Sequence, residues 1–138
     1  MGSGKIKEYK FLKPHLDKMI DAAIHAAADG GKEICGLLVD NGYFIELIQT
    51  KNKRKRGGGF AFYSQEVRSI EVAAEKLGRR IIGTFHSHPL STAIPGESDL
   101  ANAVDDSLML IIEVEDKKAG LWHIKDQTNK EAQFILVD

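Results

Sequence analysis

The sequence lacks several features that would assign it to a specialised class of protein. Its single cysteine cannot form an internal disulfide, which favours a reducing compartment and hence a cytoplasmic protein. No apolar run approaches the roughly 20 residues that a membrane-spanning helix needs. The first residues also lack the apolar stretch of a secretion signal. A net charge of −1 gives no overall attraction to nucleic acid or to a membrane surface.

What is present is the composition of an ordinary globular domain. The 138 residues are 43% hydrophobic and 28% charged, which suffices for one hydrophobic core. No internal repeat, linker or second domain is visible. Residues 1–10 are expected to be a disordered N-terminal segment or the remainder of a tag, and residues 11–138 to form a single domain.

Hydrophobic periodicity and turn residues predict helices mixed with strands. Helices are predicted over residues 14–28, 65–77 (with Ser64 as the N-cap) and 97–104. Strands are predicted over residues 33–39, 43–49, 60–63, 80–88, 108–115, 121–124 and 133–137. This order predicts a mixed β-sheet flanked by helices, which is an α+β fold or α/β sandwich.

Two histidines stand out near the end of a buried strand. Residues two apart on a strand project to the same face, so the imidazoles of His86 and His88 should converge. Pro89 is expected to end the strand, and Asp99 returns at the start of a predicted helix. Two imidazoles and one carboxylate are the protein ligands of a catalytic zinc site that leaves a fourth position for water. Histidines also occur on strands for packing alone, and the spacing by itself supports the two interpretations about equally.

A hydrolytic zinc site also needs a general base, which is commonly a glutamate that does not bind the metal. Glu33 is one candidate, because it stands at the entrance of a buried strand. Glu97, beside Asp99, is the other. The residues alone do not rank the two.

Two motifs resemble those of one enzyme family. His86-Ser87-His88-Pro89, with Asp99 eleven residues after the second histidine, resembles the metal motif of the JAMM (MPN+) metalloproteases. The segment Glu33-Ile34-Cys35-Gly36-Leu37-Leu38 is similar to the Glu-x-Cys-Gly-Leu-Leu segment of the same family. The motifs follow in the family's order, and the resemblance extends from about Leu12 to the end of the chain.

The resemblance implies a small prokaryotic-type JAMM domain with an MPN, or cytidine-deaminase-like, fold. It implies one Zn²⁺ held by His86, His88 and Asp99, with Glu33 as the residue that activates water. The implied activity is hydrolysis of a peptide or isopeptide bond at the C-terminal tail of ubiquitin or a ubiquitin-like protein. In so short a chain, we expect the partner to be a ubiquitin-like or sulfur-carrier protein that ends in Gly-Gly.

The sequence departs from the family pattern at Gly96, where the family has a serine that supports the water and the oxyanion. Glycine is an acceptable helix cap, so the metal site should be retained. Losing one oxyanion donor typically costs about 10²–10³ in rate, so activity should be low. Ser98 could replace the missing hydroxyl only if the helix began later. The departure also supports an alternative, a non-catalytic scaffold module that recognises ubiquitin-like proteins.

A basic, glycine-rich loop covers residues 51–59. Lys53, Arg54 and Arg56 could form an electropositive substrate rim, although a solvated loop without function is the simpler interpretation. The balanced total charge argues against nucleic-acid binding through this loop. Cys35 is expected to be a small buried hydrophobe, with a zinc-bound thiolate as the alternative.

Overall fold

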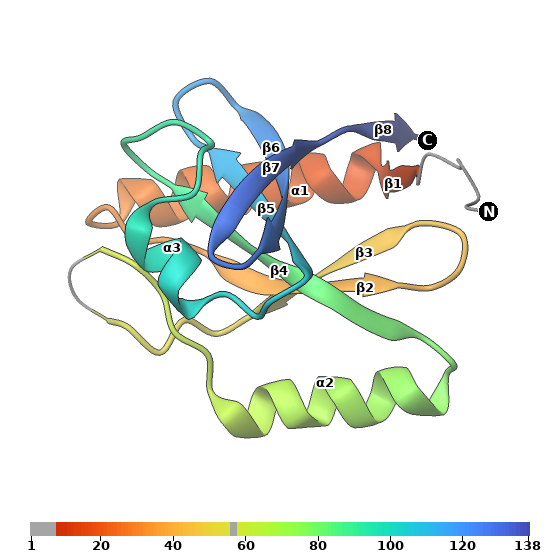
Figure 1. The fold of residues 1–138 in the computed structure, drawn as a ribbon. Coiled ribbons are helices and arrows are strands. Elements are labelled where there is room, and N and C mark those ends of the chain that lie inside the picture. The colour runs from red at the N-terminus through yellow and green to blue at the C-terminus, as the bar shows by residue number, and fades with distance from the viewer. Residues whose placement is uncertain (1–7, 56–57) are drawn as a thin grey trace.

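The computed structural model describes residues 8–55 and 58–138, which fold into eight strands and three helices (Figure 1). The helices are α1 (Lys13–Ala28), α2 (Ser64–Lys76) and α3 (Glu97–Asn102). The strands are β1 (Tyr9–Leu12), β2 (Cys35–Asp40), β3 (Ile45–Thr50), β4 (Arg80–His88), β5 (Ser107–Glu113), β6 (Lys118–Lys125), β7 (Thr128–Ala132) and β8 (Phe134–Val137). In this part of the chain no helix is long and apolar enough to span a membrane.

All eight strands belong to one mixed sheet, in the order β7-β6-β5-β4-β2-β3-β1-β8. Strand β1 pairs in parallel with both β3 and β8, and β4 pairs in parallel with β5. The other neighbouring strands are antiparallel. The predicted α+β architecture, a mixed sheet flanked by helices, is therefore confirmed.

The sheet is strongly curled. Strands β7 and β8 lie at opposite ends of the strand order, yet only Gln133 separates them in the chain. Two residues of chain can span at most about 7 Å, so the two edges must approach each other at this corner. Phe134 on β8 packs edge to face against Phe11 on β1, with ring centroids 5.4 Å apart. Ala132 of β7 packs in the same hydrophobic cluster as these two rings, so the corner is apolar.

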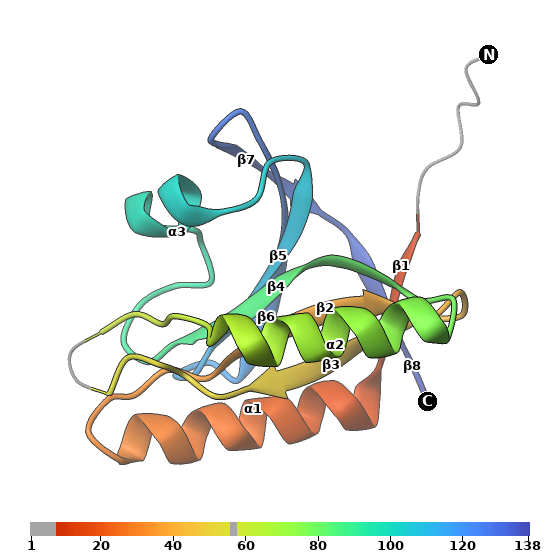
Figure 2. The same cartoon turned by 90° about the horizontal axis from the view of Figure 1, so that it is seen from below.

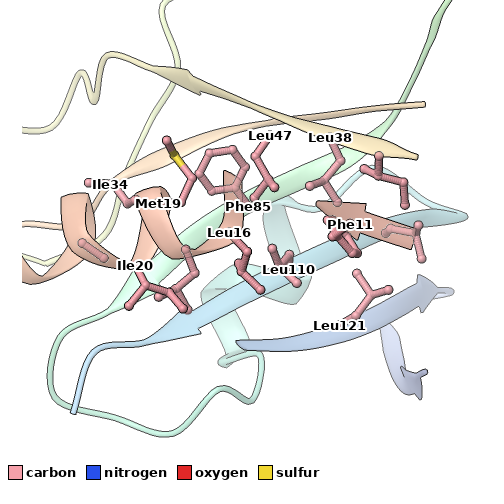
Figure 3. Packing of buried hydrophobic residues seen from close by; sticks show 14 residues of the cluster. Phe11, Leu16, Met19, Ile20, Ile34, Leu38, Leu47, Phe85, Leu110 and Leu121 are labelled. Atoms are coloured by element: carbon pink, nitrogen blue, oxygen red, sulfur yellow. The ribbon is translucent and has the colours of Figure 1, made fainter. Parts of the chain in front are cut away.

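The larger hydrophobic core lies between the sheet and α1. The buried face of α1, which includes Leu16, Met19 and Ile20, packs against apolar side chains of the sheet, among them Leu38, Phe85 and Leu110 (Figure 3). A smaller cluster lies on the opposite face, where Met109, Ile111 and Ile124 pack with Leu100 of α3. Figure 2 shows α1 and α3 on opposite sides of the sheet. One face of the sheet therefore carries most of the core, and the other carries the side chains near α3.

Several local predictions were wrong. Residues 60–63 form no strand, because the Phe60 ring stacks on His86 and the backbone of Ala61 bonds to the loop residues Asn52 and Lys53. Ser64 is the first residue of α2 and not its cap; Tyr63 holds the cap position, with no side-chain capping bond. Residues 9 and 10, predicted to lie in a disordered segment, belong to β1. Residues 1–7 lie outside the described part of the chain.

We predict that Gly36→Ala destabilises the fold. A Cβ atom at Gly36 would lie 2.3 Å from the Ile48 carbonyl oxygen and 2.3 Å from the Phe85 ring. Forcing a methyl group into such a packed position typically costs about 1–3 kcal/mol of unfolding free energy. Gly58→Ala is the matched control, because the nearest atom to a Cβ there is 4.0 Å away. Urea denaturation of both variants tests the prediction, and equal unfolding free energies would contradict it.

Candidate metal centre

Strand β4 brings the two histidines together. It is paired with β2 over residues 80–86 and with β5 over residues 83–88, so its backbone is held on both sides near the histidines. His86 and His88 project to the same face, with their Nε2 atoms 3.1 Å apart. The strand ends at His88, directly before Pro89, as the sequence predicted.

Asp99 approaches the histidines from the first turn of α3. Gly96 occupies the N-cap position of this helix, and its backbone N–H donates to Asp99 Oδ2 over 2.9 Å. Asp99 Oδ1 lies 3.3 Å from His86 Nε2, and Oδ2 lies 3.3 Å from His88 Nε2. The three side chains therefore converge on one point, although eleven residues separate His88 from Asp99.

The spacing of these three groups is compatible with a metal ion. Zinc bound tetrahedrally at its usual bond lengths of 2.0–2.1 Å places neighbouring donor atoms about 3.3 Å apart. The observed separations of 3.1 and 3.3 Å match this spacing. No other group of three or more His, Cys, Asp or Glu side chains in the described residues has a metal-binding arrangement. The donor set and its geometry both fit.

A backbone carbonyl orients His88. The Nδ1–H of His88 donates to the Thr92 carbonyl oxygen over 2.7 Å, because a carbonyl can only accept. Nε2 therefore carries the lone pair that faces the other two groups. Burial acts to lower the pKa of His88, but the bonds to Asp99 and Thr92 outweigh it and raise this pKa above its ordinary value. Burial acts to raise the pKa of Asp99, but the two histidines hold it well below its usual range.

Packing holds the ring of His86, whose polar contacts to His88 and Asp99 are made by Nε2. This side chain is fully buried, and its ring stacks on Phe60 with the centroids 4.5 Å apart. Its Nδ1 is the only buried side-chain nitrogen or oxygen in the described residues without a hydrogen-bond partner. Phe60, which follows the basic loop, therefore packs on the metal-binding group and does not belong to a strand of the sheet.

Ser87 joins β4 to the segment that carries Glu33. Its hydroxyl accepts the backbone N–H of Ile34 over 2.9 Å, and its own N–H donates to the Ile34 carbonyl over 3.1 Å. Ser87 faces away from the histidines, as the alternation of β4 requires. Cys35 is paired with His86, and the Ser87–Ile34 bonds continue this antiparallel register by one residue, which brings the adjacent Glu33 toward His88.

Glu33 itself is held by the glycine-rich loop. Its Oε2 accepts the backbone N–H of Gly59 over 2.7 Å, and its carbonyl accepts the side-chain amide of Asn52 over 3.0 Å. The half-buried carboxylate is close enough to His88 for its charge to help raise that histidine's pKa. The structure therefore brings Glu33 to the His86–His88–Asp99 group from more than fifty residues away.

The remaining predicted site residues lie at the periphery. Glu97 and Ser98 are exposed on the first turn of α3, and Ser98 lines a groove next to Asp99. The Cys35 thiol instead contacts Thr50 Oγ1 at 3.4 Å. Burial raises the pKa of this thiol, and Cys35 is not part of the metal-binding group. The expectation of a small buried residue agrees with these contacts.

The basic loop borders the site. Lys53 and Arg54 are exposed, and Arg54 lines both the groove beside Asp99 and a smaller hollow beside Glu33. Arg56 lies outside the described residues, so its place in the predicted rim is not described. The groove has a volume of about 880 Å³ and runs from Asp99 and Phe60 between α2 and β4.

Sequence reasoning missed the residues that support the site. Asn52 organises the loop: its amide nitrogen donates to two carbonyls, and its oxygen accepts the N–H groups of Arg54 and Ala61. Thr92 orients His88 through its backbone, which leaves no side-chain signature in a sequence. The aromatic character of Phe60 was visible, but it indicated a strand.

Comparisons with known proteins agree with this geometry. Residues 12–128 match the family described as prokaryotic homologs of the JAB domain. A search of the curated proteins finds no match. A solution structure of a protein from Desulfitobacterium hafniense is similar to this chain at 24% identity and a TM-score of 0.79, over 94% of this chain and 93% of that chain.

Two further solved structures share the fold. One is a JAB1/MPN domain protein from Archaeoglobus fulgidus, with 19% identity, a TM-score of 0.61, and coverage of 96% of this chain and 100% of that chain. The other is described as a metalloprotease-like zinc site in the proteasome and signalosome, with 15% identity, a TM-score of 0.50, and coverage of 97% and 100%. The resemblance found in the two sequence motifs and the MPN fold are thereby confirmed. The chain belongs to the prokaryotic JAB domain family, as a small member of the JAMM/MPN type.

Proposed function

We propose that this protein is a zinc-dependent peptidase or isopeptidase that cleaves at the C-terminal tail of a ubiquitin-like or sulfur-carrier protein. The observation that carries the proposal is the set of donor atoms on His86, His88 and Asp99, spaced 3.1–3.3 Å apart, with Glu33 on the neighbouring chain segment. Two imidazoles and one carboxylate leave a further position open, which is the arrangement of catalytic zinc sites.

His86, His88 and Asp99 would hold one zinc ion. When bound, the ion would act as a Lewis acid that polarises the substrate carbonyl and makes a water molecule more acidic. The Thr92 bond keeps His88 in the tautomer that binds through Nε2. The Gly96 N–H and the first turn of α3 orient the carboxylate of Asp99.

Glu33 would act as the general base and then as the general acid. The Gly59 N–H occupies Oε2, so Oε1 is the oxygen that would take the proton from the attacking water. The water oxygen forms the new bond to the carbonyl carbon. As the C–N bond breaks, Glu33 would deliver this proton to the leaving nitrogen.

The burial of the site supports a substrate with a slender, extended tail. The side chains of His86, His88 and Asp99 are only 0%, 11% and 13% exposed. A Gly-Gly tail has no side chains to obstruct its approach to such recessed groups. The groove between α2 and β4 would receive the residues next to the tail, and Lys53 and Arg54 would attract an acidic partner surface.

The second candidate function is a binding module that recognises ubiquitin-like proteins without hydrolysing them. Gly96 favours it, because this position supplies a backbone N–H to Asp99 but no hydroxyl to support an oxyanion. The retained metal-binding arrangement and Glu33 favour the enzyme. The experiments below separate the two.

We expect the purified protein to bind about one zinc ion per chain, and His88→Ala to bind far less. Protons compete with the metal for His88, whose pKa is raised, so zinc affinity should begin to fall at a higher pH than for an ordinary histidine. Below that pKa the loss should be about tenfold per pH unit for one displaced proton. Chelator competition between pH 8 and 5 measures this. A zinc-free protein at pH 8 in zinc-supplemented buffer would refute the site.

Glu33→Gln should abolish cleavage of a ubiquitin-like fusion while leaving zinc binding intact. Removing a general base typically lowers the rate by about 10²–10⁴. Glu97→Gln is the matched control, because Glu97 is the exposed glutamate that competed for this role. It should keep the wild-type rate. If Glu97→Gln were inactive and Glu33→Gln active, the assignment of the base would be reversed.

Gly96→Ser should raise the cleavage rate by about 10²–10³, the usual contribution of one oxyanion donor. The substitution fits the structure: the φ angle of Gly96 is −84°, and a Cβ there would lie 3.7 Å from Asp99 Oδ2. Gly96→Ala, which adds the Cβ without the hydroxyl, should keep the wild-type rate. If neither the wild type nor Gly96→Ser cleaves with zinc bound, the enzyme proposal fails and the binding module remains.

A further inference from the structure

A deeply buried carboxylate lies beside the metal-binding group without belonging to it. Glu113 ends β5 after a run of buried apolar residues and is only 6% exposed. It is paired in register with His88 on β4. No other acidic residue in the described part of the chain is in the buried class. Burying a carboxylate is costly unless hydrogen bonds compensate it, so this position calls for an explanation.

Glu113 is connected to His88 through two hydrogen bonds and one peptide group. The Glu113 carboxylate accepts the backbone N–H of Ala93 over 3.2 Å. That N–H belongs to the same peptide group as the Thr92 carbonyl. The Thr92 carbonyl in turn accepts the Nδ1–H of His88 over 2.7 Å. One planar amide therefore connects the buried carboxylate to the imidazole.

This arrangement has an electronic consequence. Hydrogen bonds in a chain polarise one another, so a negative acceptor on the amide N–H increases the negative charge on the carbonyl oxygen. A stronger bond from that oxygen to Nδ1–H makes Nε2 a better metal ligand. Outer-shell groups that bond a metal-binding histidine are usually carboxylates or carbonyls, and here a carboxylate acts through a carbonyl.

The same loop has a second anchor that does not lead to His88. Trp122 Nε1–H donates to the Ala93 carbonyl over 2.8 Å, which belongs to the next peptide group. Gly120 permits this close approach, because a Cβ there would lie 2.9 Å from the same oxygen. Trp122 therefore holds the loop in place without polarising the Thr92–Ala93 amide. The two anchors can be tested separately.

We propose that Glu113 is a positioning residue of the metal centre, which strengthens His88 as a ligand through the Thr92–Ala93 peptide. The inference rests on the proposed zinc site. The quantity that Glu113 changes directly is the zinc affinity, and any effect on the cleavage rate follows from it. The negative charge of Glu113, and not only its acceptor atom, polarises the Thr92–Ala93 amide in this arrangement. Its removal weakens zinc binding even when the loop stays in place.

The test compares Glu113→Gln, Trp122→Phe and Glu115→Gln in the full chain. Glutamine keeps an acceptor for Ala93 but removes the charge. Trp122→Phe removes the other anchor, and Glu115→Gln makes the same chemical change at an exposed position two residues away. Chelator competition measures the zinc dissociation constant, and the absorption spectrum of the Co²⁺-substituted protein reports the ligand field at the metal, to which His88 contributes. We expect zinc binding about 10–100-fold weaker and a shifted spectrum in Glu113→Gln alone.

The other outcomes overturn the inference. Wild-type zinc affinity in Glu113→Gln, or an equal loss in Trp122→Phe, would show that Glu113 only anchors the loop. Glu113→Asp is the second variant, for the case in which Glu113→Gln fails to fold. Aspartate keeps the charge but is one methylene shorter, so the charge lies farther from the Ala93 N–H. Wild-type zinc affinity in Glu113→Asp would also refute the inference. If the wild type itself binds no zinc, the proposed function fails as well, so the two failures are distinguishable.

Discussion

The pairing of β4 on both of its edges is the constraint on which the rest of the site depends. Because β5 pairs in regular register with residues 83–88 and β2 with residues 83–86, the register of this half of the strand is fixed and its side chains alternate between two faces; the pairing with β2 is irregular only before Gly83. On one face Phe85 enters the main core and Ser87 bonds to Ile34. On the other face His86 and His88 meet. A slip by one residue would exchange the two sets and remove the metal-binding group.

The partners of β4 bring one carboxylate from each side. On the β2 side, the double contact between Ser87 and Ile34 brings Glu33 toward His88. On the β5 side, Glu113 is paired with the same histidine and reaches it through the loop after β4. His88 therefore lies between Glu33, the proposed general base, and Glu113, the proposed positioning residue. The proposed difference in role follows from exposure, since Glu33 is half-buried and Glu113 is buried.

The third side of the site is the least regular. Helix α3 has six residues, which is too short to be stable alone. It is held by the packing of Leu100 on the smaller core, by the Gly96–Asp99 bond, and by the contacts of Ala93 with Glu113 and Trp122. A bound cation would join Asp99 to the histidines and so tie α3 to β4. Metal binding would therefore stabilise the order of this segment.

The sequence by itself determined the alternation of β4, the end of that strand at Pro89 and the main helices, because these depend on local periodicity and turn chemistry. Two motifs also sufficed to identify the family. The short strands β1 and β7 were not predicted, since their pairing depends on edges that only the curled sheet provides. Only the tertiary structure decided that Phe60 stacks on His86, that the Thr92 carbonyl bonds to His88 and that the Glu113 carboxylate bonds to Ala93. These contacts run through backbone groups and distant neighbours, which have no local signature in a sequence.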